Sequence, residues 1–222
     1  MIVSAFCLFN SRCIFYFYAM ITHPDKIAGA LKGELPGSQS HYKMLPPGRV
    51  LKPAPEDKSR VKLSSVLVLL FPDDDGIKVC LIKRPTYMKH HAGQIALPGG
   101  RIEPNESAQE TALRETHEEI GITHDKIRLL GTLSSFYVEV SRFQITPFVG
   151  WMDQKPEFTL CAAEVEKAIL FPIEAFKPPY STTRLKTLTG ILEVPCIKYD
   201  GEIIWGATAM ILSEFYDLIH KN

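Results

Sequence analysis

Residues 107–120 constrain the fold of this chain more than any other segment, because the signals for a helix agree at both of its ends. Ser107 and Glu110 have the spacing of a capping box, in which each side chain accepts a hydrogen bond from an otherwise unpaired backbone N–H. Gly121 is the residue type that most often ends a helix in the left-handed conformation. We therefore expect a helix from Ser107 to Ile120.

Three carboxylates of this helix share one face. At about 100° per residue, Glu115, Glu118 and Glu119 fall within roughly 100° of arc. The stripe that contains Leu113 and Ile120 adjoins this arc, so the acidic face borders the buried side. Like charges at this spacing repel, and partial burial raises the cost unless a cation neutralises them. Hard carboxylate ligands without a nearby cysteine pair favour Mg²⁺ or Mn²⁺ over Zn²⁺.

A structural alternative exists for the same residues. Glu110, Arg114 and Glu118 are four residues apart, the spacing of an ion-pair ladder on a solvated helix. Helix geometry by itself does not choose between this ladder and a metal site.

The segment from Gly100 to Ile122 resembles the Nudix box. That pattern is a glycine, five residues, Glu, seven residues, Arg-Glu, an aliphatic residue, any residue, Glu-Glu, any residue, Gly and an aliphatic residue. The residues in register are Gly100, Glu106, Arg114, Glu115, Glu118, Glu119, Gly121 and Ile122, with Thr116 at one aliphatic position. At average residue frequencies the fixed letters coincide by chance on the order of once in 10⁸ to 10⁹ windows, so coincidence is excluded.

The resemblance implies a Nudix pyrophosphohydrolase with an α/β/α sandwich and a mixed β-sheet. Such enzymes hydrolyse a nucleoside diphosphate linked to another moiety, and they hold Mg²⁺ or Mn²⁺ in the box. It implies that Glu115 and Glu119 are metal ligands, that Glu118 is a ligand or the general base, and that the Gly100 carbonyl adds an oxygen. It also implies that Arg114 orients the carboxylates.

Residues 81–100 resemble the signature of the coenzyme A (CoA) diphosphatase subgroup. The matching residues are Lys83, Arg84, His91, Gly93, Gln94, Pro98, Gly99 and Gly100, while Pro85 stands where Ser is usual and Leu97 where Phe is usual. With similar segments downstream, the resemblance spans about residues 61 to 215. It implies hydrolysis of the CoA diphosphate to 3′-phospho-AMP (3′,5′-ADP) and 4′-phosphopantetheine.

A substrate with a diphosphate and a separate 3′-phosphate needs cations besides the metal, and Arg suits bidentate phosphate contact. Arg84 and His91 are the leading candidates for substrate binding, because they lie within the matching stretch. The further candidates are Lys83, Arg101, Lys89 and Arg142, each of which could instead be a surface charge. Glu164 is a candidate base or second metal ligand from a separate loop, or an ordinary solvated residue. Phe136 and Tyr137 could stack on the adenine or belong to the core.

Two other functions stay open. The first is a Nudix hydrolase of another substrate, such as ADP-ribose or an oxidised nucleotide. The second is a nucleotide-sensing module without hydrolysis, against which the three retained carboxylates argue. The sequence does not choose among free, acylated and oxidised CoA, between Mg²⁺ and Mn²⁺, or between candidate bases.

Composition limits the partners. Lys plus Arg equals Asp plus Glu at 25 each, so binding driven by a nucleic-acid polyanion is not expected. The five cysteines include no C-x-x-C pair, and no apolar run reaches the roughly 18 residues that span a bilayer. We expect a small-molecule substrate, no membrane and a reducing, cytoplasmic setting. The C-terminal residues 220–222 carry no peroxisomal address, and a homodimer stays open.

The chain divides into three parts. Residues 1–19 are apolar and aromatic, and three interpretations stay open: an artefactual extension before Met20, a buried strand or arm, or a targeting segment. Residues 20–60 are expected to hold a short helix from Asp25 and a connector rich in Pro, Gly and Ser. Residues 61–222 are expected to form the Nudix hydrolase domain. Its expected strands are 61–71, 77–82, 127–133, 136–140, 143–149, 168–171, 192–198 and 203–205, before a helix at 206–220.

Overall fold

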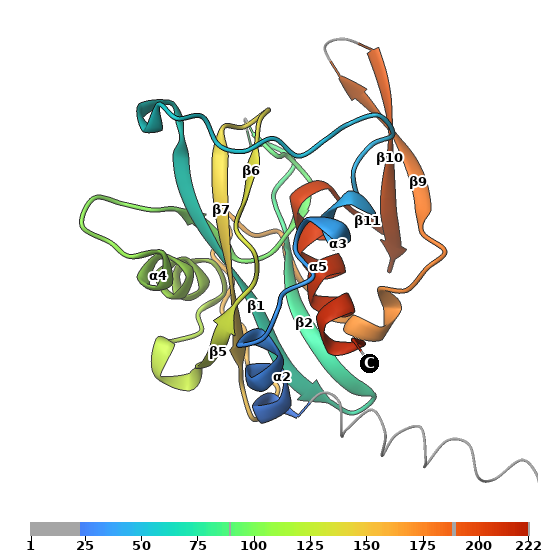
Figure 1. Ribbon diagram of the computed structural model, residues 1–222. Coiled ribbons are helices and arrows are strands. Elements are labelled where there is room, and N and C mark those ends of the chain that lie inside the picture. Colours follow the sequence, from blue (N-terminus) through green and yellow to red (C-terminus); the bar gives the residue numbers. More distant parts are fainter. Residues whose placement is uncertain (1–22, 89, 188–189, 222) are drawn as a thin grey trace, which may run out of the picture.

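The computed structural model describes residues 23–221 except 89 and 188–189 (Figure 1). The prediction for residues 1–19 and the candidate cation Lys89 lie outside these residues. The helices are α2 (Pro24–Leu31), α3 (Ser38–Tyr42), α4 (Ala108–Ile120) and α5 (Gly206–Ile219), with short 3₁₀ helices η1 (Lys58–Arg60), η2 (His124–Lys126) and η3 (Ile173–Ala175). The strands are β1 (Lys62–Asp73), β2 (Gly76–Lys83), β3 (Ile95–Ala96), β4 (Gly99–Arg101), β5 (Arg128–Thr132), β6 (Phe136–Val138), β7 (Phe143–Trp151), β8 (Lys167–Pro172), β9 (Ser181–Thr187), β10 (Gly190–Tyr199) and β11 (Glu202–Trp205).

A mixed sheet forms the centre of the molecule. Its main path runs β3-β2-β1-β7-β5, while β4 pairs with β1, β6 with β7 and β8 with β2. β1 and β7 are parallel, with Lys62 opposite Phe143 and Leu70 opposite Trp151, and the other pairs are antiparallel. The predicted fold class, an α/β sandwich with a mixed sheet, is confirmed.

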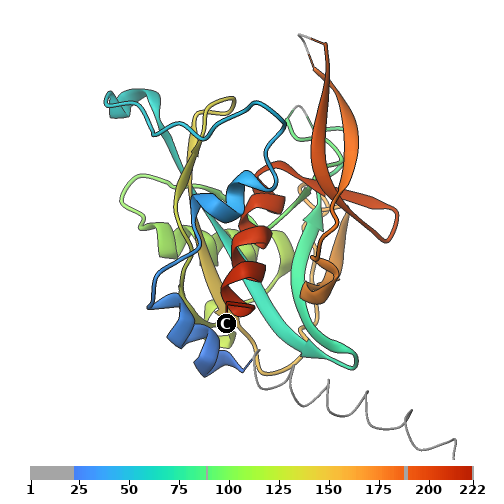
Figure 2. The same cartoon turned by 45° about the vertical axis from the view of Figure 1, so that its right-hand side comes forward.

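Helices cover both faces of this sheet (Figures 1 and 2). Successive side chains of a strand point to opposite faces, so the apolar run of β1 supplies two cores. Leu67 and Leu69 pack in one core with Ile120 of α4. Val68 packs in the other core with Phe215 of α5. Burial on both faces explains why the run is continuously apolar instead of alternating.

The segment before β1, which contains α2 and α3, packs in the core on the α5 side of the sheet. The rings of Phe136 and His41 lie 4.7 Å apart, and His41 in α3 pairs with Glu214 in α5 at 2.9 Å, both almost fully buried. Burial raises the pKa of Glu214, but hydrogen bonds from His41 and Ser134 outweigh it and hold that pKa below its ordinary value. The sequence predicted α2 but not α3, which lies within the expected connector.

A second sheet has the order β11-β10-β9, and its β9–β10 ribbon extends from the body (Figure 2). The sequence did not predict β9, because its residues STTRLKT are mostly polar. The strand forms because it pairs with β10, from Ser181 opposite Cys196 to Thr187 opposite Gly190. Among the described residues, the helices are too short or too polar to cross a membrane.

Candidate active site

Helix α4 is fixed at both ends by the residues that the sequence indicated. The Ser107 side chain accepts from the Glu110 N–H at 3.2 Å, and the Glu110 carboxylate accepts from the Ser107 N–H at 2.8 Å. Gly121 ends the helix with φ 77°, in the left-handed region. Thr116 is fully buried, and its hydroxyl donates to the Ala112 carbonyl at 2.7 Å. The capped helix therefore presents its acidic residues from a fixed support.

The three carboxylates differ sharply in burial. The side chain of Glu119 is 1% exposed, that of Glu115 15% and that of Glu118 52%. The acidic arc borders the buried stripe of the helix, and the packing of that stripe on the sheet sets how deeply each carboxylate is buried. Glu119 therefore lies deepest in the site and Glu118 lies at its mouth.

Glu119 is a buried acid whose negative charge is only partly stabilised by neighbouring groups. Its Oε2 accepts from the Gly99 N–H at 2.9 Å, and its Oε1 lies 3.4 Å from Nη1 of Arg84. Burial raises the pKa of Glu119 to about 8, and the nearby charges of Glu115 and Glu164 add to the rise. The Gly99 N–H and the Arg84 charge oppose it. At this position a further cation would stabilise the ionised carboxylate.

Arg114 holds the other carboxylates in place. Its guanidinium makes two bonds to Glu106, Nε to Oε1 at 2.8 Å and Nη2 to Oε2 at 3.1 Å. Its Nη1 contacts Glu115 Oε1 at 2.9 Å and Glu118 Oε2 at 2.8 Å. The hydrogen bonds from Arg114 lower the pKa of Glu106 to about 2. The ladder alternative is thus half realised: Arg114 pairs with Glu118, whereas Glu110 caps the helix.

Two glycines allow the backbone of β4 to approach these acids. A β-carbon on Gly100 would lie 2.2 Å from Glu115 Oε1, and one on Gly99 would lie 2.4 Å from the Ser65 carbonyl oxygen. Gly99 also has φ 152°, which L-residues with side chains rarely adopt. Both glycines are therefore required sterically: Gly99 lets β4 approach β1, and Gly100 lets Glu115 pack directly against the backbone.

The donor set fits a hard divalent ion. Carboxylate oxygens of Glu115 and Glu119, with the Gly100 backbone beside them, are the ligand type that Mg²⁺ and Mn²⁺ prefer. Within the part of the chain that the structure describes, no three His, Cys, Asp or Glu side chains already converge as a metal site, so the fit rests on the chemistry of these two carboxylates and not on a preformed cage. Arg114 contacts both Glu115 and Glu118, so its positive charge neutralises part of the negative charge of these two carboxylates.

The loop after β2 brings Arg84 to the carboxylates. The Arg84 N–H donates to the Gln94 carbonyl at 3.0 Å and the Gly93 N–H donates to the Arg84 carbonyl at 3.1 Å, which closes the loop. Nε of Arg84 is buried without a hydrogen-bond partner. His91 is exposed, has φ 56°, and its Nδ1 lies 2.8 Å from Gln94 Oε1. Arg84 therefore lies at the acids, while His91 lies on the outer part of the loop.

The other candidates are in different surroundings. Lys83 pairs with Glu166 at 3.1 Å and with Glu202 at 3.2 Å, so its ammonium bridges the residue before β8 and the start of β11. Arg101 is exposed on β4, and its carbonyl accepts from Nη2 of Arg114 at 3.4 Å. Phe136 belongs to the core. Tyr137 and Arg142 line a separate pocket.

A contact between two loops was not anticipated. The Tyr87 hydroxyl donates to the Ala162 carbonyl at 2.8 Å, and so connects the Arg84 loop to the loop that carries Glu164. The charge of Glu164 raises the pKa of both Glu115 and Glu119, so Glu164 lies in the neighbourhood of the acidic site. The sequence carries no pattern that indicates a role for Tyr87, because its hydrogen-bond partner is a backbone carbonyl 75 residues away.

Comparisons with known proteins show which family and which proteins this chain is similar to. The family model described as "NUDIX domain" matches residues 61–189. "Nudix hydrolase 3" of Caenorhabditis elegans is 35% identical over 176 residues, covering 71% of this chain and 73% of that protein. "Peroxisomal coenzyme A diphosphatase ndx-8" of the same organism is 32% identical over 117 residues, covering 51% of this chain and 50% of that protein. The crystal structure of a MutT protein from Methanosarcina mazei Go1 has a TM-score of 0.48 at 19% identity, covering 78% of this chain and 100% of that chain.

Proposed function

The chain belongs to the NUDIX domain family, and on this premise we propose that it hydrolyses the diphosphate of coenzyme A or of a CoA derivative. Water attacks one phosphorus, the P–O–P bond breaks, and the products are 3′,5′-ADP and 4′-phosphopantetheine. As a Nudix hydrolase it acts on a nucleoside diphosphate derivative; the choice of CoA is the proposal.

The observation that supports this choice is that the stretch resembling the CoA diphosphatase signature lies at the acidic site. The stretch that resembles the CoA diphosphatase signature contains Arg84 and ends at Gly99 and Gly100. All three meet the carboxylates of α4: Arg84 and Gly99 contact Glu119, and Gly100 packs against Glu115. The signature is thus part of the acidic site, where it is suited to hold a diphosphate.

Each residue of the site has a distinct task in this proposal. Glu115 and Glu119, with the Gly100 backbone, hold the divalent ion, which when bound supplies Lewis-acid polarisation of the phosphate oxygens. Arg84 orients the diphosphate with its charge and its unpartnered Nε. Arg114 keeps Glu115 and Glu118 in position and does not contact the substrate.

Two carboxylates are candidates to accept the proton of the attacking water. Glu118 is half exposed at the mouth of the site, and Arg114 fixes its Oε2. Glu164 belongs to a separate loop, and its charge acts on Glu115 and Glu119. We assign the proton to Glu118, because its position is fixed by an ion pair from within the site.

Product identification tests the proposal. Purified protein is incubated with CoA, ADP-ribose or an oxidised nucleotide, with Mg²⁺, Mn²⁺ or a chelator, and the products are identified by mass spectrometry. We expect 3′,5′-ADP and 4′-phosphopantetheine from CoA, only with metal. Faster turnover of ADP-ribose or the oxidised nucleotide would assign another substrate. Nucleotide binding without turnover of any compound would assign a sensing module.

A further inference from the structure

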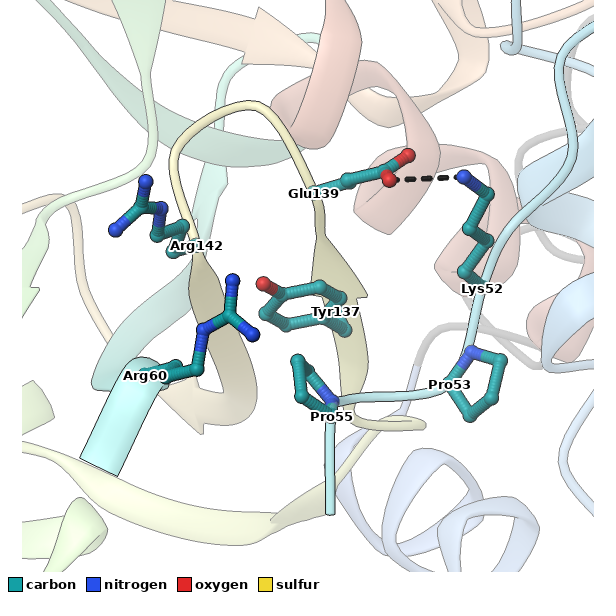
Figure 3. A pocket seen from close by; sticks show the side chains of 7 residues that line it. All are labelled: Lys52, Pro53, Pro55, Arg60, Tyr137, Glu139 and Arg142. Atoms are coloured by element: carbon teal, nitrogen blue, oxygen red, sulfur yellow. Dashed lines mark hydrogen bonds and ion pairs between the residues drawn. The ribbon is translucent and has the colours of Figure 1, made fainter. Parts of the chain in front are cut away.

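A separate pocket of about 330 Å³ lies where the connector before β1 passes the β6–β7 hairpin (Figure 3). Arg142 lies in the hairpin turn with φ 59°, and its carbonyl accepts from the Lys62 N–H at 2.8 Å. Arg60 ends η1, two residues before Lys62 begins β1. This contact therefore fixes the hairpin turn beside the segment that carries Arg60. The lining residues are Lys52, Pro53, Pro55, Arg60, Tyr137, Glu139 and Arg142.

The pocket has an excess of positive charge. Lys52 pairs with Glu139 at 2.8 Å, so these two charges offset each other. Arg60 and Arg142 make no salt bridge with any residue in the described part of the chain. Figure 3 shows the two arginines entering from different segments, with the Tyr137 ring between Arg60 and Lys52. Two unpaired guanidinium groups at one cavity are suited to a phosphate, which each can contact with two N–H groups.

The pocket lies on the same face of the sheet as α4. Tyr137 is directly opposite Gln144 in the β6–β7 pair, so both side chains point to one face. Phe148 is four residues further along β7 and therefore points to that face as well, where it packs against the core that contains Ile120 of α4. The pocket and the acidic site thus open on the same side of the sheet.

The spacing along β1 matches one nucleoside. Ser65 pairs with Gly100 of the acidic site, and Lys62 pairs with Phe143, which follows Arg142. These positions are three residues apart along β1, about 10 Å, and β4 and β7 flank β1 on opposite sides, so the two backbone points lie roughly 14 Å apart. A ribose with phosphates on two of its carbons, together with the length of an arginine side chain, spans that gap.

We infer that this pocket binds the substrate's second phosphate, the monoester on the ribose, while its diphosphate lies at the carboxylates of α4. The inference rests on the proposed function, since CoA carries a 3′-phosphate in addition to the diphosphate. The assignment divides the cations of the protein between two phosphate groups: Arg84 serves the diphosphate, and Arg60 and Arg142 serve the ribose phosphate.

The kinetic test compares CoA with dephospho-CoA, which lacks the 3′-phosphate. The variants are R142Q, R60Q and the control K58Q, which removes an exposed charge from η1 outside the pocket. Loss of one charged hydrogen-bonding group is expected to raise KM for CoA about tenfold. The KM for dephospho-CoA and the kcat for both should stay unchanged, and K58Q should match the parent. Equal effects on both substrates, or none, would overturn the inference.

A binding test judges the pocket even if CoA is not the substrate. Affinities of the metal-free protein for adenosine 3′,5′-bisphosphate, 5′-AMP and inorganic phosphate are measured by calorimetry. We expect the bisphosphate to bind about tenfold more tightly than 5′-AMP, and R142Q to remove that difference. Unchanged binding in R142Q and R60Q would refute the site. Inorganic phosphate as tight as the bisphosphate would show a free-anion site and overturn the assignment to substrate. Failure of CoA turnover alone would reject only the proposed function.

Discussion

The Glu115 carboxylate lies against the backbone of Gly100, so that a β-carbon at position 100 would come within 2.2 Å of Oε1. Arg114 donates to that same oxygen at 2.9 Å. The acid is therefore confined by a strand and a guanidinium, and its position depends on the absence of a single methyl group. This relationship makes residue 100 a sensitive test of the site.

We expect Gly100→Ala to lower turnover at least a hundredfold, because the methyl group displaces Glu115 from the position in which it would bind metal. The free energy of unfolding should fall by about 1–3 kcal/mol, as for an overpacked site. Steady-state kinetics and urea unfolding measure the two effects. Gly29→Ala is the matched control, because nothing lies within 4 Å of its added methyl group. Normal turnover in Gly100→Ala would show that Glu115 does not act from this position.

Glu119→Gln tests the metal site by a measurement other than activity. The substitution keeps the size of the side chain but removes a buried charge that burial and neighbouring acids disfavour. We expect Mg²⁺ or Mn²⁺ to raise the melting temperature of the parent by ligand linkage, and to raise that of Glu119→Gln far less. Turnover should fall by a factor of a hundred or more while the fold is retained. Glu157→Gln, an exposed acid, is the control.

Equal metal stabilisation in the parent and in Glu119→Gln would remove Glu119 from the ligand set. Undiminished turnover in that variant would contradict the Nudix-type mechanism as a whole. The two measurements are independent, because stabilisation reports binding and turnover reports chemistry.

Local chemistry explains which parts of this structure the sequence could predict. Ser107, Glu110 and Gly121 define α4 within one segment, and the structure has the expected capping box and left-handed end. The apolar run of β1 is equally local. By contrast, α3 depends on burial of His41 against Glu214, 173 residues away, and its sequence SQSHY carries no periodic signal.

The site divides in the same way. Spacing along one helix predicts that Glu115, Glu118 and Glu119 share a face, but it does not give their different burial, which α4 acquires by packing on the sheet. The contact between Arg84 and Glu119 joins residues 35 apart and depends on the register of β1, β2 and β4. Long-range pairing of this kind leaves no periodic pattern in a single sequence.

Glu106 gives a prediction on pH. Two hydrogen bonds from Arg114 are the main reason that its folded-state pKa falls from 4.5 to about 2. An acid with a depressed pKa stabilises the fold fully above its unfolded pKa, and this contribution is lost as pH falls from about 4.5 towards 2. We expect Glu106→Gln to lower the free energy of unfolding by about 2 kcal/mol at pH 7. Urea unfolding at pH 7, 5 and 3 measures the difference.

The difference between Glu106→Gln and the parent should narrow between pH 4.5 and 2, the range in which the parent carboxylate gains its proton. Glu103→Gln changes an exposed acid in the same loop and should follow the parent at every pH. If the free energies of unfolding of the parent and of Glu106→Gln differ as much at pH 3 as at pH 7, Glu106 stabilises the loop by packing and not by charge.

Arg84→Gln tests whether Arg84 contacts the diphosphate of the substrate or its ribose phosphate. Since Nη1 of Arg84 lies 3.4 Å from Glu119, a phosphate that it contacts must lie at the carboxylates, and so belongs to the diphosphate. We therefore expect KM to rise by the same factor, about tenfold, for CoA and for dephospho-CoA. Arg49→Gln, an exposed charge in the connector, should leave both unchanged. A larger rise for CoA than for dephospho-CoA would transfer the ribose phosphate to Arg84, and would leave Arg60 and Arg142 without a role in substrate binding.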